Sequence, residues 1–508
     1  MSSDSQERGP GTASEPRGAS VADVAVTISI TIGLLGLSVF MFGSDSSSGA
    51  NQIALVIGAV LATIVGIKNG HSWKVIERNI VDGIATAMPA ILILFSVGSL
   101  IGVWMLSGTV PTMIYYGLLL LDPSVFYPAT CLLCAIVALS IGSSWTVAST
   151  LGVALIGVAG ALGLSIEITA GAVISGAYFG DKMSPLSDTT NLAPAVTGID
   201  IFTHIRAMVW TTTPSFLFAL AAFAFIGLSP PEGDNIGTLE QTLTLLQENF
   251  HIGPLMLLPV ALVVFLAARK VPAVAAILAG VALGAVMALL FQRRVILEFA
   301  GSPETSAMTE LFKGVWEVLF DGYTGRTGGE TLDALLSRGG MSSMLNTVWL
   351  IITAMCFGSA MEKAGILQRL VQSLVAFARS TGGLIATTIT TCFGVNALAA
   401  DQYMSIVITG RMFRDEYRSR GLHPKNLSRV LEDSGTITSP LVPWNTCGAY
   451  MAAALGVPTL AYLPFCFFNL VNPFVSMAYG YTGFKIEHGD DALWDDPDHA
   501  PRSAEGNA

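Results

Sequence analysis

Long apolar runs recur along the whole chain, and they constrain its fold more than any other feature. Runs near 24–42, 51–69, 84–107 and 204–228 each hold about 20 residues or more, enough for a helix to cross a hydrocarbon core of about 30 Å. Inside a bilayer, only helices and closed barrels satisfy every backbone polar group. Charged residues make up 12% of the chain, whereas soluble proteins carry about 25%. These features predict an all-α polytopic membrane protein with about 11–13 transmembrane helices.

Two apolar segments, 112–122 and 366–378, are too short to cross a bilayer alone. Short segments of this kind are typical of half-helices or re-entrant pieces, which membrane proteins tolerate where the backbone faces a cavity or other protein groups. We therefore expect broken helices among the full spans.

Composition divides the chain into five parts. Residues 1–22 form a polar, Pro/Gly/Ser-rich tail without the apolar core of a signal peptide, and residues 485–508 form an acidic tail. Both tails are predicted to be disordered and cytoplasmic. Between them we expect transmembrane repeat 1 over 23–228, an external linker over 229–250, and transmembrane repeat 2 over 251–484 with a loop insertion at 292–344.

The distribution of lysine and arginine predicts the orientation. Positive residues gather in the connections 68–78 and 411–425 and at Arg269 and Lys270, whereas 229–250 contains none. The positive-inside rule puts the first three on the cytoplasmic side of the cell membrane and the last one outside. The net charge of −11, without a basic stripe, argues against a nucleic-acid partner.

Three short matches relate the two halves of the chain. "GSSWTVAST" at Gly142 aligns with "GVNALAADQ" at Gly394, "SPLSDTTN" at Ser184 with "SPLVPWNT" at Ser439, and "IGVWMLSGTV" at Ile101 with "FGSAMEKAGI" at Phe357. Their offsets of 252, 255 and 256 residues are nearly constant, which indicates a duplication. Because an external linker separates the halves, the repeats are predicted to be inverted, as in many secondary transporters.

The stretch "SGAYFGDKMSPLSDTTNLAPAVTG", residues 175–198, concentrates polar side chains between apolar runs. Pro185 and Pro194 bracket its polar part, and prolines also precede Asn445 and Thr446 in the second half. Proline breaks helices, and polar groups at bilayer depth are costly unless they face a cavity or bind something. We predict two broken hairpins whose tips meet near the membrane centre. Two surface loops rich in turn formers are the alternative.

Oxygen atoms at these tips would replace the hydration shell of a hard cation such as Na⁺. The predicted sodium ligands are Asp188, Thr190, Asn191, Asn445 and Thr446. Further candidate ion- or proton-binding residues are Ser184, Thr189, Ser439 and Asn396, the last of which aligns with Ser144 across the repeats. Hydrogen bonding between helices is the alternative role for Asn396 and Ser144.

Five carboxylates are candidates for coupling, namely Asp181, Asp188, Asp401, Glu432 and Asp433. A desolvated carboxylate in an apolar segment, such as Asp401, can hold a proton or a cation but not both. That competition is the simplest chemistry for exchange. The structural alternatives are a helix-packing hydrogen bond for Asp401 and an ion pair with Lys182 for Asp181. Glu432 and Asp433 are alternatively cytoplasmic charges.

The remaining histidine, cysteine and motif features do not indicate an enzymatic reaction. His204 is a pH sensor or, alternatively, a structural residue. Cys131 and Cys134 lie in an apolar run without further metal ligands and are predicted to be core residues. The sequence contains no metalloprotease or serine-hydrolase motif. We therefore predict no enzyme and no cofactor; an ion channel is the alternative from another class.

Two long motifs carry a resemblance to a known family. "GAYFGDKMSPLSDTTNLAPAVTGIDIFTHIR" and "NALAADQYMSIVITGRMF…LEDSGTITSPLVPWNTCGAYMAAALGV" resemble the signature of the NhaC family of sodium/proton antiporters, over roughly 24–485. The resemblance implies exchange of Na⁺, with Li⁺ as an alternative, for H⁺ and a fold with paired re-entrant hairpins. It also keeps open an organic-acid antiporter of the malate/lactate type coupled to Na⁺ or H⁺, for which Lys182 is the candidate cationic partner. A homodimer is left open.

Overall fold

The structure is a computed structural model that describes residues 17–228, 235–301, 306–375, 378–489 and 491–494. Most of the predicted N-terminal tail and most of the acidic C-terminal tail lie outside the described residues. The described part contains no β-strand and only two isolated bridges, Tyr323–Arg338 and Leu422–His488. The all-α prediction is confirmed.

The helices of the first half follow one another closely. In chain order they are α1 (Val21–Phe42), α2 (Ala50–Lys68), α3 (Trp73–Thr86), α4 (Met88–Leu106), α5 (Thr109–Leu120), α6 (Phe126–Ile141), α7 (Ser144–Val147), α8 (Val153–Ala161), α9 (Ile166–Met183), α10 (Asp188–Thr197) and α11 (Ile201–Gly227). A π-helical turn, η3 (Ala148–Gly152), joins α7 to α8.

The second half contains the remaining helices and a second π-helical turn. They are α12 (Asn235–Asn249), α13 (Leu258–Ala268), α14 (Ala273–Phe291), α15 (Arg293–Ala300), α16 (Ala307–Asp321), α17 (Glu330–Leu336), α18 (Leu345–Lys363), α19 (Ile366–Val375), α20 (Thr381–Leu398), α21 (Gln402–Ser419), α22 (Pro424–Leu431), α23 (Thr446–Leu455), α24 (Thr459–Tyr462) and α25 (Phe467–Thr482). The π-helical turn η6 (Glu432–Thr436) continues α22, and a 3₁₀ turn η7 (Ser439–Leu441) follows it.

Fewer helices than expected are long and apolar enough to span a membrane. The described residues contain eight, or up to ten if each of two bent helix pairs counts as one span, against the 11–13 expected from the sequence. The apolar segments 112–122 and 366–378 form the short helices α5 and α19, as predicted for segments that cannot span alone. One bent pair, Thr446–Leu455 with Thr459–Phe465, turns by 88°, so broken helices are present in the second half.

Two segments expected to be connections contain helices. The external linker 229–250 includes α12, and the loop insertion 292–344 includes α15, α16 and α17. In α16 the side chains of Leu311 and Val315 are buried, whereas Phe312 and Trp316 are exposed. One apolar face of the helix therefore packs on the protein while large apolar side chains remain exposed on another face, and the mixed charge of the segment concealed the helix in the sequence analysis.

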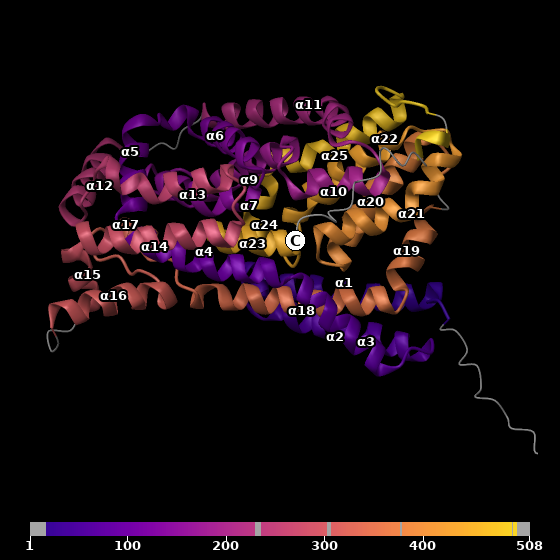
Figure 1. The fold of residues 1–508 in the computed structure, drawn as a ribbon, viewed down its shortest axis with the longest axis horizontal. Helices are drawn as coiled ribbons and strands as arrows, with labels where there is room; N and C mark the ends of the chain where they lie inside the picture. Colours follow the sequence, from indigo (N-terminus) through magenta and orange to yellow (C-terminus); the bar gives the residue numbers. More distant parts are fainter. Residues whose placement is uncertain (1–16, 229–234, 302–305, 376–377, 490, 495–508) are drawn as a thin grey trace, which may run out of the picture.

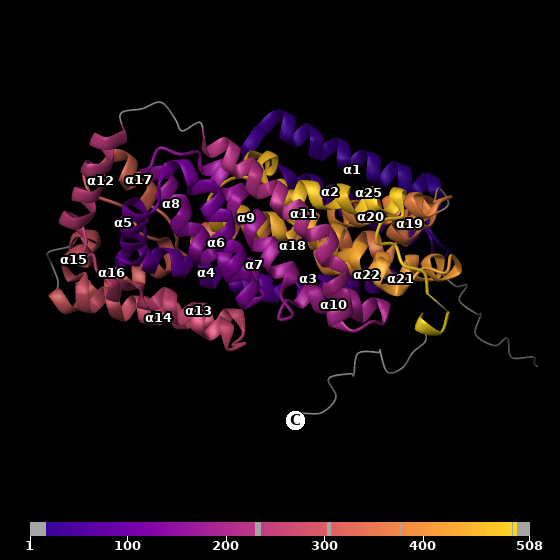
Figure 2. The ribbon, with the colours of Figure 1, turned by 90° about the horizontal axis from the view of Figure 1, so that it is seen from above.

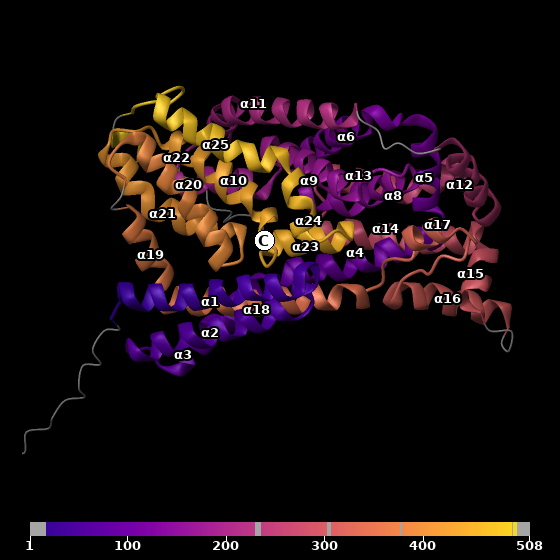
Figure 3. The ribbon, with the colours of Figure 1, turned by 180° about the vertical axis from the view of Figure 1, so that it is seen from behind.

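The helices form an elongated bundle in which most long helices run along the same direction (Figure 1). Helices α1, α2, α3 and α18 lie along one side, and α6 and α11 lie along the opposite side, as the view from behind also shows (Figure 3). Helices α12 and α15–α17 occupy one end of the bundle, whereas α19, α21 and α22 occupy the other end (Figure 2). The basic connection 411–425 and the linker helix α12 therefore lie at opposite ends of the bundle, and their assignment to the two sides of a membrane stays a prediction.

Small residues allow the closest helix packing in the protein core. A Cβ atom added to Gly176 of α9 would lie 2.0 Å from the carbonyl oxygen of Cys131 on α6, and one added to Gly180 would lie 2.3 Å from that of Ala135. Without a hydrophobic driving force between helices in lipid, close backbone approach of this kind supplies much of the association energy. The "GAYFG" spacing is thus a packing motif between α6 and α9.

We predict that Gly180→Ala lowers stability by about 1–3 kcal/mol, because the added methyl group must displace the backbone of α6. The measurement is the thermal unfolding midpoint of the purified protein in detergent. Gly36→Ala is the matched control, since nothing lies within 4 Å of its added Cβ atom. An unchanged midpoint for Gly180→Ala would contradict the prediction, because it would show that α6 moves to accommodate the methyl group without a loss of stability.

Candidate functional site

Two helix breaks at equivalent places in the two halves open the protein interior. Helix α6 ends at Gly142, which has a φ of 74°, and Ser143 caps the N-terminus of α7. Helix α20 ends before Ala400, which has a φ of 59°, and Asp401 caps the N-terminus of α21. An L-residue in this left-handed region is strained by about 1–2 kcal/mol, and such strain is typical of sites that the surrounding structure holds in place.

Two hairpins lie next to these breaks. The first hairpin contains α10, and the second contains η7 and α23. Ser187 caps α10 and Asn445 caps α23, and each of these ten-residue helices ends at a left-handed glycine, Gly198 or Gly456. Each of these four positions in the first half has its equivalent 258 residues later in the chain (400 minus 142). The pairs are Gly142 and Ala400, Ser143 and Asp401, Ser187 and Asn445, and Gly198 and Gly456. The offsets read from the sequence were shorter because matched letters, such as the two Ser-Pro-Leu triplets, do not occupy equivalent turns. The inverted relation of the repeats stays a prediction.

The second hairpin supplies the hydrogen bonds that the end of α20 loses at its break. Trp444 Nε1 donates to the Ala397 carbonyl at 2.7 Å, Asn445 Nδ2 donates to the Asn396 carbonyl at 3.0 Å, and the Thr446 amide donates to the Ala400 carbonyl at 2.9 Å. Orphan carbonyls at a helix end are costly away from water. The hairpin tip and the α20 break therefore stabilise each other.

A cavity of about 380 Å³ lies where the breaks and hairpin tips meet. Residues from both halves of the chain line it, and we call it the acidic cavity. Its polar lining consists of Thr86, Ser143, Ser144, Asp181, Ser187, Asp188, Thr189, Asp401, Gln402, Tyr403 and Thr446. Among the described lining residues there are three aspartates and no lysine, arginine or histidine.

Asp181 and Asp401 are held by backbone and hydroxyl donors. Asp181 Oδ2 accepts hydrogen bonds from Ser144 Oγ at 2.7 Å and from the Ser144 amide at 3.0 Å. Asp401 Oδ1 accepts one from the Met404 amide at 2.9 Å. This bond is a local N-cap of α21 and differs from the helix-packing hydrogen bond considered as the alternative, and Asp401 also lines the acidic cavity.

The same contact recurs in the second half with neutral partners. Gln402 and Ser439 are each 258 residues beyond Ser144 and Asp181. Ser439 Oγ donates to Gln402 Oε1 at 3.3 Å. The equivalent of the Ser144–Asp181 bond therefore lacks a charge, which makes the two halves chemically unequal.

A fully buried ion pair lies behind the acidic cavity. Lys182 Nζ lies 2.5 Å from Asp433 Oδ1 and donates a further hydrogen bond to Asn472 Oδ1 at 3.1 Å. Thr211 Oγ1 donates to Asp433 Oδ1 at 2.9 Å, and Arg429 Nε lies 4.0 Å from Asp433 Oδ2. Lys182 thus pairs across the repeats with Asp433, and the alternative ion pair between Lys182 and Asp181 is wrong for this structure.

Glu432 is also buried and connects this region to the first hairpin. Thr189, which lines the acidic cavity, donates to Glu432 Oε1 at 2.9 Å. Glu432 Oε2 has no hydrogen-bond partner among the described residues. Glu432 and Asp433 are both 0% exposed, so the alternative that they are surface charges next to the basic connection is wrong. Buried polar atoms without partners are uncommon and need a functional explanation.

The predicted sodium ligands do not all converge. Asp188 and Thr446 line the acidic cavity, whereas Thr190 Oγ1 donates to the Lys182 carbonyl at 3.0 Å. Asn191 is exposed and bonds the Ser187 carbonyl, while Asn445 is used as a cap. Thr190, Asn191 and Asn445 thus bond backbone groups in this structure, and the five-residue sodium site stays a prediction.

Four other candidates support the backbone or the hairpins. Ser184 Oγ accepts from the Leu186 amide at 3.3 Å, and Asn396 Nδ2 donates to the Gly435 carbonyl at 2.6 Å. Ser439 bonds the Thr436 carbonyl in addition to Gln402. His204 is buried, with Nδ1 2.7 Å from Ser428 Oγ, which agrees with its structural alternative.

Several lining or supporting residues were not found from the sequence. Ser143, Gln402 and Tyr403 line the acidic cavity, and Thr211 and Asn472 complete the ion-pair network. Asn472 carried a usable signal, since it precedes a proline within an apolar run. Thr211 carried none, because threonines on a transmembrane helix commonly bond their own backbone.

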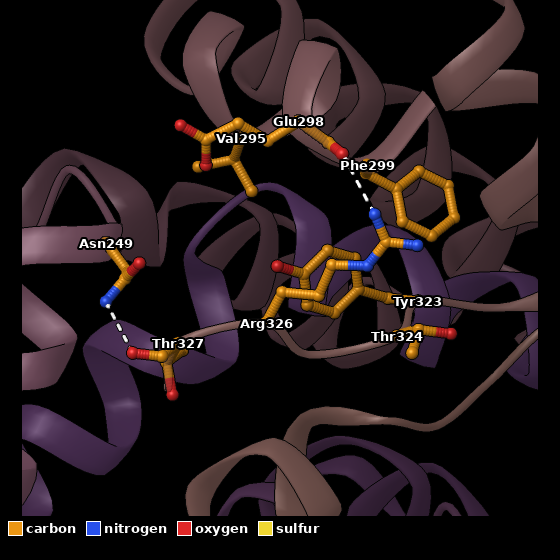
Figure 4. Close-up of a pocket in the computed structure, with 8 residues that line it drawn as sticks. All are labelled: Asn249, Val295, Glu298, Phe299, Tyr323, Thr324, Arg326 and Thr327. Atoms are coloured by element: carbon orange, nitrogen blue, oxygen red, sulfur yellow. Dashed lines mark hydrogen bonds between the residues drawn. The ribbon is translucent and has the colours of Figure 1, made fainter. Parts of the chain in front are cut away.

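A second, much smaller cavity lies at the end of the bundle near α12 and α15 (Figure 4). Arg326 donates to the Glu298 carbonyl and Asn249 donates to the Thr327 carbonyl across its edges. Its volume of about 20 Å³ holds about one water molecule, so it is too small for substrate. In the described part of the chain, no group of three His, Cys, Asp or Glu side chains is placed to hold a metal ion.

Comparisons with known proteins agree with the sequence motifs. A family model described as the Na⁺/H⁺ antiporter family matches residues 176–484. The Na⁺/H⁺ antiporter NhaC of Alkalihalophilus pseudofirmus is 38% identical over 462 residues, which cover 91% of this chain and 96% of that protein. The malate-2H⁺/Na⁺-lactate antiporter of Bacillus subtilis is 37% identical over 433 residues, 85% of this chain and 89% of that protein. The arginine/ornithine antiporter ArcD of Halobacterium salinarum is 34% identical over 481 residues, 94% of each.

We predict that Lys182→Met destabilises the protein by about 3–5 kcal/mol, because Asp433 is left buried without its partner. The double variant Lys182→Met with Asp433→Asn removes both charges and should recover most of that loss. Thermal unfolding midpoints in detergent measure both effects. Arg78→Met is the control, since its pair with Asp82 is exposed and worth little. An unchanged midpoint for Lys182→Met would contradict the prediction.

Proposed function

Because the chain belongs to the Na⁺/H⁺ antiporter family, we propose that it exchanges Na⁺ for H⁺ across the cell membrane by alternating access. The acidic cavity is the proposed site at which the two ions compete. It lies between helix breaks of both halves, where many secondary transporters bind substrate and coupling ions. The chain is thus a multi-pass transporter, and its two halves would rock about this site.

One observation carries the choice of a cation. The described lining of the acidic cavity contains three aspartates and no cationic side chain. Aspartates placed together repel one another when all are ionised, and either a bound cation or a proton relieves that repulsion. A carboxylate-bearing substrate would meet the same repulsion without a balancing charge. The lining therefore favours a cation over an organic acid.

The three aspartates are proposed to have unequal roles. Ser144 donates two hydrogen bonds to Asp181, which fix the position of this carboxylate and suit a lasting Na⁺ ligand. Asp188 is exposed at the cavity surface, where water brings and removes ions. Asp401 sits at the α20 break and lines the acidic cavity, and exchange of its proton for Na⁺ would couple the two ions.

Glu432 is a proposed second proton holder. Its Oε2 lacks a hydrogen-bond partner in the described structure, and Thr189 joins it to the cavity wall beside Asp188. A carboxyl group buried beside Lys182 and Asp433 can be neutral or charged as the nearby charge changes. A proton that moves between the acidic cavity and Glu432 would then be a second transported proton. Its transport would not require a second Na⁺.

The size of the acidic cavity favours a second candidate function. At about 380 Å³ it has room for about twelve water molecules of about 30 Å³ each, far more than a bare Na⁺ needs. A cationic amino acid, as named for the Halobacterium salinarum relative, would suit the aspartates, and Trp145 and Tyr403 in the wall offer ring faces to a cation. The malate/lactate alternative is weaker, because Lys182 is engaged by Asp433.

The test uses everted membrane vesicles with an imposed inside-acid pH gradient. Collapse of the gradient on adding Na⁺ or Li⁺, but not arginine, ornithine or malate, supports the proposal. Uptake of labelled arginine that depends on ornithine inside the vesicles, without collapse of the gradient on adding Na⁺ or Li⁺, would establish the second candidate. Sodium-dependent uptake of malate without a response to cations would replace both with the organic-acid reading. The homodimer stays a prediction for a separate measurement of mass in detergent.

We predict that Asp181→Asn, Asp188→Asn and Asp401→Asn each lose sodium-dependent collapse of the gradient, since each removes a carboxylate that the proposal needs for binding, entry or exchange of the ions. Asp415→Asn is the matched control, because Asp415 is exposed on α21 outside the acidic cavity. Full exchange by Asp401→Asn at every pH tested would rule out its coupling role.

A further inference from the structure

A further polar cavity, distinct from the acidic cavity and from the small cavity near α12, lies at the end of the bundle that carries α21 and α22. It has a volume of about 220 Å³ and is lined by side chains from α11, from α22 and from the segment 483–489 after α25. Its charged lining residues are Arg206, Lys425, Arg429, Lys485 and Glu487. We call it the basic cavity, since four positive side chains meet one negative side chain there.

The single carboxylate of the basic cavity is already paired. Lys425 Nζ forms an ion pair with Glu487, and this hydrogen bond holds the pKa of the Glu487 carboxyl below its usual value. Glu487 is therefore ionised at neutral pH and neutralises Lys425. Arg206 and Lys485 have no carboxylate partner among the described residues, and Arg429 shares Asp433 with Lys182.

Arg429 is the strongest indication of a missing ligand. Its residue exposure is 1%, and the Nε and Nη2 atoms have no hydrogen-bond partner among the described residues. The Nη1 atom donates to the Lys485 carbonyl at 3.1 Å, and the nearest carboxylate, Asp433, is 4.0 Å from Nε. Buried charged donors without acceptors are destabilising, and the planar guanidinium is suited to two parallel bonds from a phosphate or carboxylate.

Hydrogen bonds hold the wall made by the segment after α25 in place. The His423 amide donates to the Glu487 carbonyl at 3.0 Å, Asn426 Nδ2 donates to the same carbonyl at 2.7 Å, and the Gly489 amide donates to the Gly421 carbonyl at 3.0 Å. The wall is therefore fixed to α22 and the turn before it. A pre-formed wall lowers the ordering cost of binding.

Aromatic side chains surround the opening of the basic cavity. Lys485 Nζ lies 3.9 Å from the ring centre of Trp210, and Trp210 also contacts Phe484 edge to face. Trp210 and Phe484 are 46% and 47% exposed. Trp210 lies in the third turn of α11, which is long and apolar enough to span a membrane. Exposed aromatic rings beside basic groups at the end of a span are typical of the membrane–water interface.

We propose that the basic cavity binds a phosphate-bearing anion, and that this anion is the headgroup of an anionic phospholipid. The positive charges of Arg206 and Lys485 attract a phosphate, and the buried Arg429 Nε and Nη2 donors lack an acceptor that a phosphate could supply. The exposed rings match the acyl chains next to a headgroup. Basic cavities between transmembrane helices on the cytoplasmic side are suited to anionic headgroups, and the positive-inside rule predicts that side for this end of the bundle.

Binding of an anion in the basic cavity would also affect the buried ion pair between Lys182 and Asp433. Arg429 lies one helical turn before Asp433, whose other oxygen binds Lys182. A phosphate that accepts hydrogen bonds from Arg429 would draw its guanidinium away from Asp433. Lipid at this site would therefore change the electrostatic surroundings of the buried pair without entering the acidic cavity.

The test measures binding to the full-length purified protein in neutral detergent. The probes are short-chain phosphatidylglycerol, short-chain phosphatidylcholine and inorganic phosphate, with bound lipid counted by native mass spectrometry and affinity obtained by titration. The variant is Arg206→Gln with Lys485→Gln, both exposed positions, and Arg206→Gln alone serves if the pair fails to fold. Arg269→Gln with Lys270→Gln is the matched control, because it removes the same charge from exposed residues outside the basic cavity.

We expect saturable binding of phosphatidylglycerol that is weakened about tenfold or more in the Arg206/Lys485 variant, since two charge-assisted contacts are lost. Phosphatidylcholine should not compete, and the Arg269/Lys270 control should bind like the unaltered protein. Equal binding of phosphatidylglycerol by variant and control would overturn the proposal. Tight, variant-sensitive binding of inorganic phosphate without a preference for phosphatidylglycerol would overturn the lipid as occupant.

Discussion

Backbone groups freed inside a bilayer must find partners within the protein, and this requirement shapes the centre of the molecule. The break after α20 frees carbonyls that the second hairpin takes up through Trp444, Asn445 and the Thr446 amide. The break after α6 packs equally closely, since a Cβ atom on Gly142 would meet the backbone of Leu186 at 2.7 Å. Each hairpin is therefore fixed by a break, and the acidic cavity is the space that this arrangement leaves.

The buried charges add a second level of organisation. Lys182 comes from the first half and Asp433 from the second, so their ion pair joins the halves at a point beyond the acidic cavity. Such a pair contributes little net stability, since desolvation offsets most of the attraction, but it disfavours any arrangement that separates the two charges. Asn472 and Thr211 complete the hydrogen bonds around it, which ties α25 and α11 to the same point.

Part of the site could be predicted from the sequence and part could not. Prolines next to polar residues in apolar runs predicted both hairpins, and the carboxylates Asp181, Asp188 and Asp401 do face one cavity. Thr190 and Asn191 look equally suitable as ligands in the sequence, yet both satisfy local backbone carbonyls. A hydroxyl or amide near a helix break serves the backbone or a ligand equally well, and only its direction in space decides between the two.

The sequence by itself determined the helical, membrane-spanning class of the protein, its internal similarity and its family, because apolar run length and motif order survive without any knowledge of packing. The tertiary structure alone decided which charges meet. Lys182 lies next to Asp181 in the chain but pairs with Asp433, and Arg206, Arg429 and Lys485 form one cavity although three separate segments carry them. Pairing in a low-dielectric interior depends on distances of a few ångströms, and those distances arise from helix packing that no local pattern encodes.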